Sequence, residues 1–206
     1  MNGGVSSRVF LLSPANTSGL RAKQLTSPQA GFDAAVRYRS PEGVMVAEAF
    51  AFMSALYFRG KIAYSLHFGG AENTHVIAPG FGLVPPTWTI TEPRMKIMRK
   101  TDVDMRDRVY VKTLRASATD LASTLDADAH IVLLGSVATG KYVDILLPIF
   151  GDRLRFPAAF AGLGDMSRGG LMLRAVRANR ELEYTTLDAP RHRTPGAGGK
   201  MPAHLL

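Results

Sequence analysis

The chain of 206 residues contains no cysteine. This absence excludes disulfide bonds, cysteine-ligated zinc, iron–sulfur clusters and thiol catalysis. A chain without disulfides is compatible with a reducing compartment, and we expect a cytoplasmic protein. Its composition, 46% hydrophobic and 20% charged residues, is ordinary for a globular protein with a real core.

The sequence also lacks a run of residues that is apolar enough to cross a membrane. The longest candidate, GVMVAEAFAFMSALYF, carries Glu48 near its middle and is short for a bilayer. The N-terminal VFLL is too brief for a signal-peptide core. We therefore expect no membrane among the partners of this protein.

Several catalytic and metal-binding motifs are missing as well. The histidines show no metal-ligand spacing, so we predict neither a metal nor a cofactor; they are His67, His75, His130, His192 and His204. No G-x-S-x-G motif is present, and neither Ser13 nor Ser136 has an evident His or Asp partner. The sequence therefore does not favour a serine hydrolase.

Strand-like apolar runs alternate with helical patterns along the chain, and no internal repeat is found. The runs lie at residues 7–15, 74–86, 130–136, 153–160 and 181–187. Such alternation is typical of an α/β fold. We predict a single three-layer α/β domain over residues 1–189, with a mostly parallel central sheet and helices on both faces. Residues 190–206 are predicted to form a flexible, basic tail rich in Pro and Gly.

A long helix is predicted over residues 41–69, with Ser40 as its N-cap. Its apolar residues occur on nearly every face, which indicates a largely buried helix. Glu48 and Arg59 are about three turns apart and share one face of this helix. We expect them to form a buried polar pair that supports a site.

The stretch GSVATGKY, residues 135–142, has the spacing of a Walker A loop up to its last position. Tyr142 stands where a Ser or Thr must hold magnesium, and no Walker B strand follows. Three interpretations stay open: a strand-to-helix turn with Thr139 as N-cap, an anion-binding turn without magnesium, and, least favoured, a degenerate P-loop NTPase.

Ligands of parallel α/β sheets bind beyond the carboxyl ends of the strands. Small or polar residues follow several predicted strands, and GLGDMSRGG opens a predicted helix. We predict a ligand- or phosphate-binding site from Ser13, Asn16, Gly82, Ser136, Thr139, Lys141, Tyr142, Asp165, Ser167 and Arg168. In it, Lys141 and Arg168 would hold phosphate, and Tyr142 would stack on a base or hydrogen-bond to it. No general acid or base is identifiable.

The chain has a formal net charge of +8 and a pI of about 10.0, a balance that permits binding to nucleic acid. Arg108, Lys112 and Arg115 recur at i, i+4 and i+7 on one predicted helix face. This face is either simply solvated or a contact surface for a phosphate backbone. No aromatic residues interleave the charges as in a platform for stacking single-stranded bases.

Five segments carry a resemblance to known proteins: SRVFLLSPAN, YFRGKIAYSLHF, HVIAPGFGLVPP followed by ITEP, HIVLLGS with KYVDILLP, and FPAAFAGLGDMSRGGLMLR. Their order resembles a bacterial family of uncharacterised proteins and, more distantly, the YaaA-type and uracil-DNA-glycosylase-like α/β proteins. The resemblance covers roughly Arg8 to Tyr184, and GFGLVPP is its most telling motif. It implies a crevice of nucleobase or nucleotide size and a connection to nucleic acid. The first loop, SPANTSG, lacks the Cys and the Lys-rich loop common in such relatives, and no catalytic residue is carried over.

The leading hypothesis is therefore a cytoplasmic protein that binds a nucleotide or nucleic acid in a crevice at the strand ends. Cleavage or transfer at a glycosidic bond is the reaction class to test first. The alternative is a non-enzymatic nucleic-acid-binding module that uses the basic helix face and the tail, and an NTP hydrolase is a third possibility.

Overall fold

Six strands form the central sheet: β1 (Arg8–Leu12), β3 (Thr74–Ala78), β4 (Gly82–Val84), β6 (His130–Leu134), β7 (Leu154–Pro157) and β8 (Tyr184–Thr186). The computed structural model describes residues 7–186, so the predicted tail lies outside the described residues. The strands follow the order β4-β3-β1-β6-β7-β8. The inner strands β3, β1, β6 and β7 are parallel, and antiparallel β4 and β8 form the edges.

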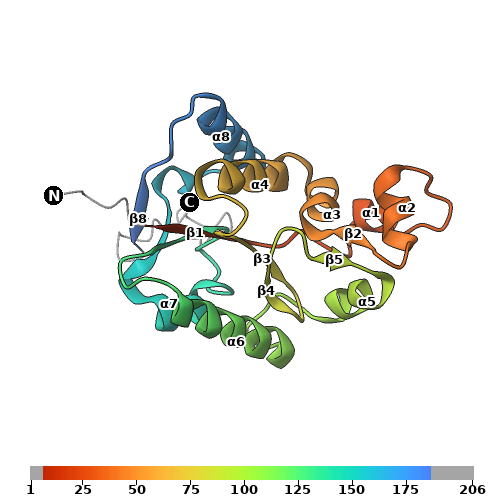
Figure 1. Cartoon of the computed structure of the whole chain (residues 1–206), viewed down its shortest axis with the longest axis horizontal. Helices are drawn as coiled ribbons and strands as arrows, with labels where there is room; N and C mark the ends of the chain where they lie inside the picture. The colour runs from red at the N-terminus through yellow and green to blue at the C-terminus, as the bar shows by residue number, and fades with distance from the viewer. Residues whose placement is uncertain (1–6, 187–206) are drawn as a thin grey trace, which may run out of the picture.

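Helices cover both faces of this sheet (Figure 1). On one face lie α4 (Ala55–Gly69) and α8 (Asp165–Arg177), and on the other lie α6 (Arg108–Thr124) and α7 (Val143–Phe150). Phe10 and Leu12 of β1 pack with the first pair, whereas Val9 and Leu11 pack with the second. This alternation follows from the two-residue period of a strand, and it explains why β1 is apolar throughout. The predicted single three-layer α/β domain is confirmed.

Beside the sheet lies a smaller group of elements that carries the chain from β1 to β3 and on to α6 (Figure 1). It consists of α1 (Leu20–Leu25), α2 (Asp33–Arg39), α3 (Val46–Met53), α5 (Glu92–Lys100) and the antiparallel pair β2 (Val44–Met45) with β5 (Thr89–Ile90). Among the helices of residues 7–186, none combines the length and the apolar composition needed to cross a bilayer.

The single long helix predicted over residues 41–69 is wrong. Residues 44–45 pair with β5 instead, and Gly43 permits this with a φ of 77°. The helical part is then divided into α3 and α4 at Ser54, where Ala55 adopts a φ of 45°. Non-glycine residues rarely adopt a positive φ, so the sequence pattern gives no sign of this break. The break redirects α4 so that its first turn lies at the carboxyl edge of the sheet.

Glycine allows α4 and α8 to approach each other at backbone distance. A Cβ atom added at Gly60 would lie 2.6 Å from the carbonyl oxygen of Gly169, and one added at Gly169 would lie 2.6 Å from that of Leu56. Contacts this short require a residue without a side chain. The two helices therefore cross backbone to backbone, which fixes the first half of α4 relative to the start of α8.

The edge strand β4 is held against α6. The Ser117 hydroxyl of α6 accepts a hydrogen bond from the backbone N–H of Leu83 at 2.8 Å. A Cβ atom at Gly82 would collide with Ser117 and with the Thr113 carbonyl oxygen, so Gly82 is needed for this close packing. The segment that follows the turn after β3 is thus held against α6 as the short antiparallel strand β4.

The N-terminus of α6 is capped by Asp107, whose carboxylate accepts hydrogen bonds from the N–H groups of Val109 at 2.9 Å and Tyr110 at 3.0 Å. These bonds lower the pKa of Asp107. We expect Asp107→Ala to destabilise the protein by about 1 kcal/mol, and Asp107→Asn to cost only a few tenths, because Asn retains the capping acceptor. Urea denaturation checks this, and equal losses in both variants would contradict a capping role.

Candidate functional site

A cavity of about 450 Å³ lies at the carboxyl edge of the sheet, and we call it the crevice. The loop after β1 and the loop after β6 form its centre, together with the first turn of α4 and the segment after α5. From β1 the chain crosses to β3 on one side, and from β6 it crosses to β7 on the other. The crevice therefore lies at the point where the strand order reverses, which is the usual ligand position in open α/β sheets.

Ser13 lines the crevice and contacts the buried Lys61, which is not itself part of the lining. Ser13 follows β1 directly and is 5% exposed, while Lys61 reaches it from α4 and is 1% exposed. The Lys61 Nζ atom lies 2.7 Å from the Ser13 hydroxyl and 2.9 Å from the Ser13 carbonyl oxygen. The amine also lies 3.9 Å from the centroid of the Tyr57 ring. Lys61 thus has polar and aromatic contacts but forms no ion pair among the described residues.

Burial lowers the pKa of Lys61 from its ordinary value of 10.5 to about 7. The charged groups that face it from neighbouring elements are Asp165, which raises this pKa, and Arg168 and Lys141, which lower it. Burial dominates because the amine loses its water shell and gains no carboxylate in direct contact. The Lys61 amine therefore loses its proton at a much lower pH than an ordinary lysine.

Tyr57 contributes a buried hydroxyl that lies beside the Arg168 guanidinium. Its Oη atom forms no hydrogen bond of ordinary geometry within the described part of the chain, although it interacts with Arg168 and the residue lines the crevice. Burial raises the pKa of Tyr57, and the nearby Arg168 guanidinium opposes this rise only in part. A buried hydroxyl without a well-formed hydrogen bond is unfavourable by about 1–3 kcal/mol. A ligand in the crevice could supply that hydrogen bond.

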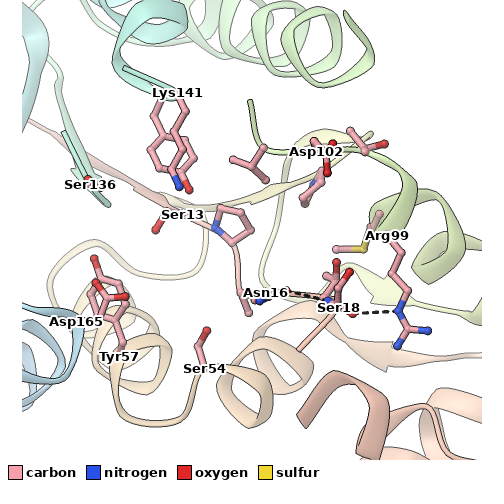
Figure 2. Close-up of a pocket in the computed structure, with 18 residues that line it drawn as sticks. Ser13, Asn16, Ser18, Ser54, Tyr57, Arg99, Asp102, Ser136, Lys141 and Asp165 are labelled. Carbon is pink, nitrogen blue, oxygen red and sulfur yellow. Dashed lines mark hydrogen bonds between the residues drawn. The ribbon is translucent and has the colours of Figure 1, made fainter. Parts of the chain in front are cut away.

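The first turn of α4 also opens on the crevice. Ser54 is its N-cap but forms no side-chain capping hydrogen bond, so the hydroxyl does not occupy the first-turn N–H groups. Figure 2 shows Ser54 and Tyr57 on one side of the crevice and Lys141 on the other, with Ser13 between them. The helix end therefore contributes the positive end of its dipole to the same cavity.

The loop after β6 is not a compact Walker A turn. Helix α7 begins at Val143 with Tyr142 as N-cap, so Lys141 precedes the helix, and Thr139 is not the cap. In a P-loop the glycine-rich turn leads directly into the phosphate-binding helix N-terminus. Lys141 instead extends over the Tyr142 ring, 5.3 Å from its centroid, and lines the crevice. Tyr142 is itself 4% exposed and its pKa is raised by burial, so its hydroxyl stays protonated at neutral pH.

Arg99 of α5 lines the crevice but is used to hold the loop after β1. Its guanidinium donates to the Thr17 carbonyl oxygen at 3.0 Å, to the Thr26 hydroxyl at 2.9 Å and to the Ala22 carbonyl oxygen at 3.3 Å. These bonds tie α5 to the loop and to α1. Arg99 is therefore a positioning residue with most of its donors already occupied.

The structure brings together part of the predicted ligand set. The members of the predicted set that line the crevice are Ser13, Asn16, Ser136, Lys141, Tyr142 and Asp165. Gly82 packs on α6 instead, Thr139 and Ser167 are exposed outside the lining, and Arg168 donates twice to the Phe160 carbonyl oxygen. Arg168 was predicted to hold phosphate, but its guanidinium donates hydrogen bonds to a backbone carbonyl oxygen and lies close to Asp165.

The predicted pair of Glu48 and Arg59 does not form. Glu48 forms an ion pair with Arg37 of α2, and Arg59 is exposed. The break at Ser54 puts the two residues on different helices, so their spacing no longer places them on one face. The predicted basic face does exist as a surface, because Arg108, Lys112 and Arg115 are all exposed on α6.

Sequence reasoning missed Lys61, Tyr57, Ser54 and Arg99 as parts of the site. One signal could have identified Lys61: it lies inside a helix whose apolar residues were predicted to be buried on nearly every face. A lysine in such a helix is buried or must reach a polar site. Its partner Ser13 could not be inferred, because the contact joins residues far apart in the chain.

Comparisons with known proteins add no relative to this geometry. No protein-family model, no curated protein and no solved structure matches the chain. Groups of three or more His, Asp or Glu side chains that could hold a metal ion are absent from residues 7–186. Function is therefore inferred from the crevice itself.

Proposed function

We propose that the protein binds a small, anionic ligand of nucleotide size in the crevice. The observation that carries this proposal is the buried Tyr57 hydroxyl, which lacks a hydrogen bond of ordinary geometry and belongs to a residue lining a cavity bounded by Lys141 and by the N-terminus of α4. A helix N-terminus with free N–H groups and a nearby lysine is a favourable site for phosphate. The cavity volume of about 450 Å³ lies within the usual range for small-molecule sites.

The remaining wall offers groups that suit a base or sugar. Asn16, Ser18 and Asp102 line the side of the crevice that lies away from α4 (Figure 2). Amide, hydroxyl and carboxylate groups can pair with the donors and acceptors of a nucleobase or a ribose. The Asn16 side chain is partly committed, because it accepts a hydrogen bond from the Ser18 N–H at 2.9 Å.

Glycosidic-bond cleavage stays a prediction from the sequence. Asp102 and Asp165 supply carboxylates to the crevice, yet both are exposed to solvent. Release of free base from nucleosides and nucleotides, measured on the wild type and on Asp165→Asn, would test this reaction separately from binding.

Binding is tested by a thermal-shift screen of nucleotides, nucleosides and short oligonucleotides, followed by calorimetric titration. At one hundred times Kd, a bound nucleotide should raise Tm by about 5 °C or more, because ligand binding stabilises the native state by about 2.7 kcal/mol. Lys141→Ala should weaken binding about ten- to a hundredfold through loss of a charged contact. Lys112→Ala is the matched control, since this lysine lies on α6 outside the crevice.

Tyr57→Phe gives a second and more specific test. It removes the buried hydroxyl and keeps the ring under Lys61. The free protein should therefore be as stable as the wild type or slightly more stable, while its affinity for the ligand should fall. A variant that loses stability without losing affinity would contradict the proposed role.

Binding of oligonucleotides alone, abolished by reversing the charges of Arg108, Lys112 and Arg115, would instead establish the basic face as the functional surface.

A further inference from the structure

The Ser13–Lys61 pair is not needed for ligand binding as described above. Lys61 is almost wholly buried and directs its amine at the Ser13 hydroxyl from 2.7 Å. Ser13 lies in the lining of the crevice, at the end of a central strand. A nucleophile hydrogen-bonded to a base beside a cavity is the arrangement that covalent catalysis requires.

The contacts of Nζ suit a neutral amine. A neutral amine has one lone pair and two N–H donors, so the lone pair can accept the Ser13 O–H while one N–H donates to the Ser13 carbonyl oxygen at 2.9 Å. The Lys61 pKa of about 7 makes this form abundant at neutral pH. No carboxylate among the described residues is bonded to the amine and holds it in the charged form.

Tyr142 adds a third polar group to the cluster. Its hydroxyl interacts with the Ser13 side chain, and this interaction lowers the Tyr142 pKa less than burial raises it. Tyr142 is therefore a protonated donor at the pH where Lys61 loses its proton. Such a donor can stabilise negative charge that develops on an oxygen near Ser13.

We propose that Ser13 is an acyl-accepting nucleophile, that Lys61 is its general base, and that the crevice hydrolyses an ester of a small polar molecule. The Ser13 oxygen forms a bond to the acyl carbon while its proton passes to the Lys61 amine. The bond to the leaving alcohol then breaks, and the Lys61 ammonium returns the proton to the departing oxygen. Water next attacks the acyl-serine, gives its proton to Lys61, and releases the acid as Ser13 regains a proton.

This activity goes beyond the proposed binding function. It requires the crevice to admit a small ester, but it does not require that ester to be a nucleotide. Nucleotide binding and acyl transfer can therefore succeed or fail separately, and the experiment below contains no nucleotide.

The test uses p-nitrophenyl acetate as the probe and the full chain as the enzyme. Release of p-nitrophenol is followed with time, and the acetylated residue is located by intact-mass and peptide mass spectrometry. We expect acetylation of Ser13 in the wild type, none at this position in Ser13→Ala, and retained acetylation of Ser13 in Ser123→Ala, which removes an exposed serine of α6 outside the crevice lining. Lys61→Met should lower the rate about a hundredfold, as expected for loss of a general base.

The pH profile separates a base from a merely structural lysine. The wild-type rate should rise about tenfold per pH unit below pH 7 and level off above it, since only the neutral amine accepts a proton. Lys61→Met should lose this inflection while circular dichroism shows an intact fold. Acetylation at Lys141 or elsewhere but not at Ser13, no acetylation at all, or an unchanged rate in Lys61→Met would each overturn the proposal.

Discussion

Replacing Lys61 by methionine should make the protein more stable at pH 7, by about 2 kcal/mol. The buried amine has a pKa of about 7 against an ordinary value of 10.5, which corresponds to about 5 kcal/mol for holding the charged form in the folded state. The loss of the hydrogen bonds to Ser13 cancels about half of the stability that is gained by removing the buried amine. Methionine is one heavy atom shorter than lysine and similarly flexible, so it fills most of the space of the lysine side chain.

The same residue should impose a pH dependence on stability. Between pH 7 and 10.5 the unfolded chain keeps the Lys61 proton and the folded chain does not, so stability rises with pH. Below about pH 7 both states are protonated and the dependence vanishes. Wild-type stability should therefore increase by about 2 kcal/mol from pH 7 to pH 9, and Lys61→Met should remain nearly constant.

Urea titrations at several pH values measure both effects. The range from pH 7 to pH 9 lies above the titration of His75 and His130, whose pKa values are lowered. It also lies below the ionisation of the tyrosines, which occurs near pH 10 in the unfolded state. Lys112→Met is the control, because this lysine is exposed and should leave the slope unchanged. Parallel curves for the wild type and Lys61→Met would show that Lys61 is charged in the folded protein.

A second large effect is expected at the crossing of α4 and α8. Gly169→Ala places a methyl group 2.6 Å from the Leu56 carbonyl oxygen and 2.9 Å from the Tyr57 Cα atom, so the helices must separate. We expect a loss of about 3 kcal/mol or more in the free energy of unfolding, at the upper end for overpacked sites. The movement should also weaken binding in the crevice, because Tyr57 lies at the contact.

The neighbouring glycine supplies the matched control. A Cβ atom at Gly170 would meet only the flexible end of Arg174 at 3.3 Å. Gly170→Ala should therefore stabilise α8 by about 0.5–1 kcal/mol through helix propensity. Opposite signs for two adjacent Gly→Ala changes, measured by urea denaturation, would establish the backbone contact; two similar gains would refute it.

The fold was accessible from sequence because its strands are short apolar runs that alternate with helical patterns. Residues 8–12 and 130–134 lie at the centre of the sheet, and burial on both faces leaves the continuous hydrophobic signature that was recognised. The start of α3 at Val46 was not accessible, because it depends on pairing between residues 44–45 and β5, and the break at Ser54 was not, because it depends on the positive φ of Ala55. Tertiary contacts there override a sequence that favours an unbroken helix.

The candidate site was partly accessible for a related reason. Ser13, Ser136 and Lys141 follow strands directly, so the topology of a parallel sheet places them at one edge. Tyr57 reaches the crevice from helix α4 instead, at the contact between α4 and α8, and Lys61 contacts Ser13 from the same helix. Arg168 shows the reverse case, since a residue type suited to phosphate donates two hydrogen bonds to the Phe160 carbonyl oxygen and does not line the crevice.

The attachment of β4 to α6 has a consequence for how molecules of this protein meet one another. Exposed edge strands recruit strands from other chains, and aggregation and domain swapping begin in this way. Strand β4 is only three residues long, and the Leu83 N–H is already donated to Ser117. A foreign strand would therefore find little to pair with at this edge, and Ser117→Ala should make the protein more prone to self-association on storage.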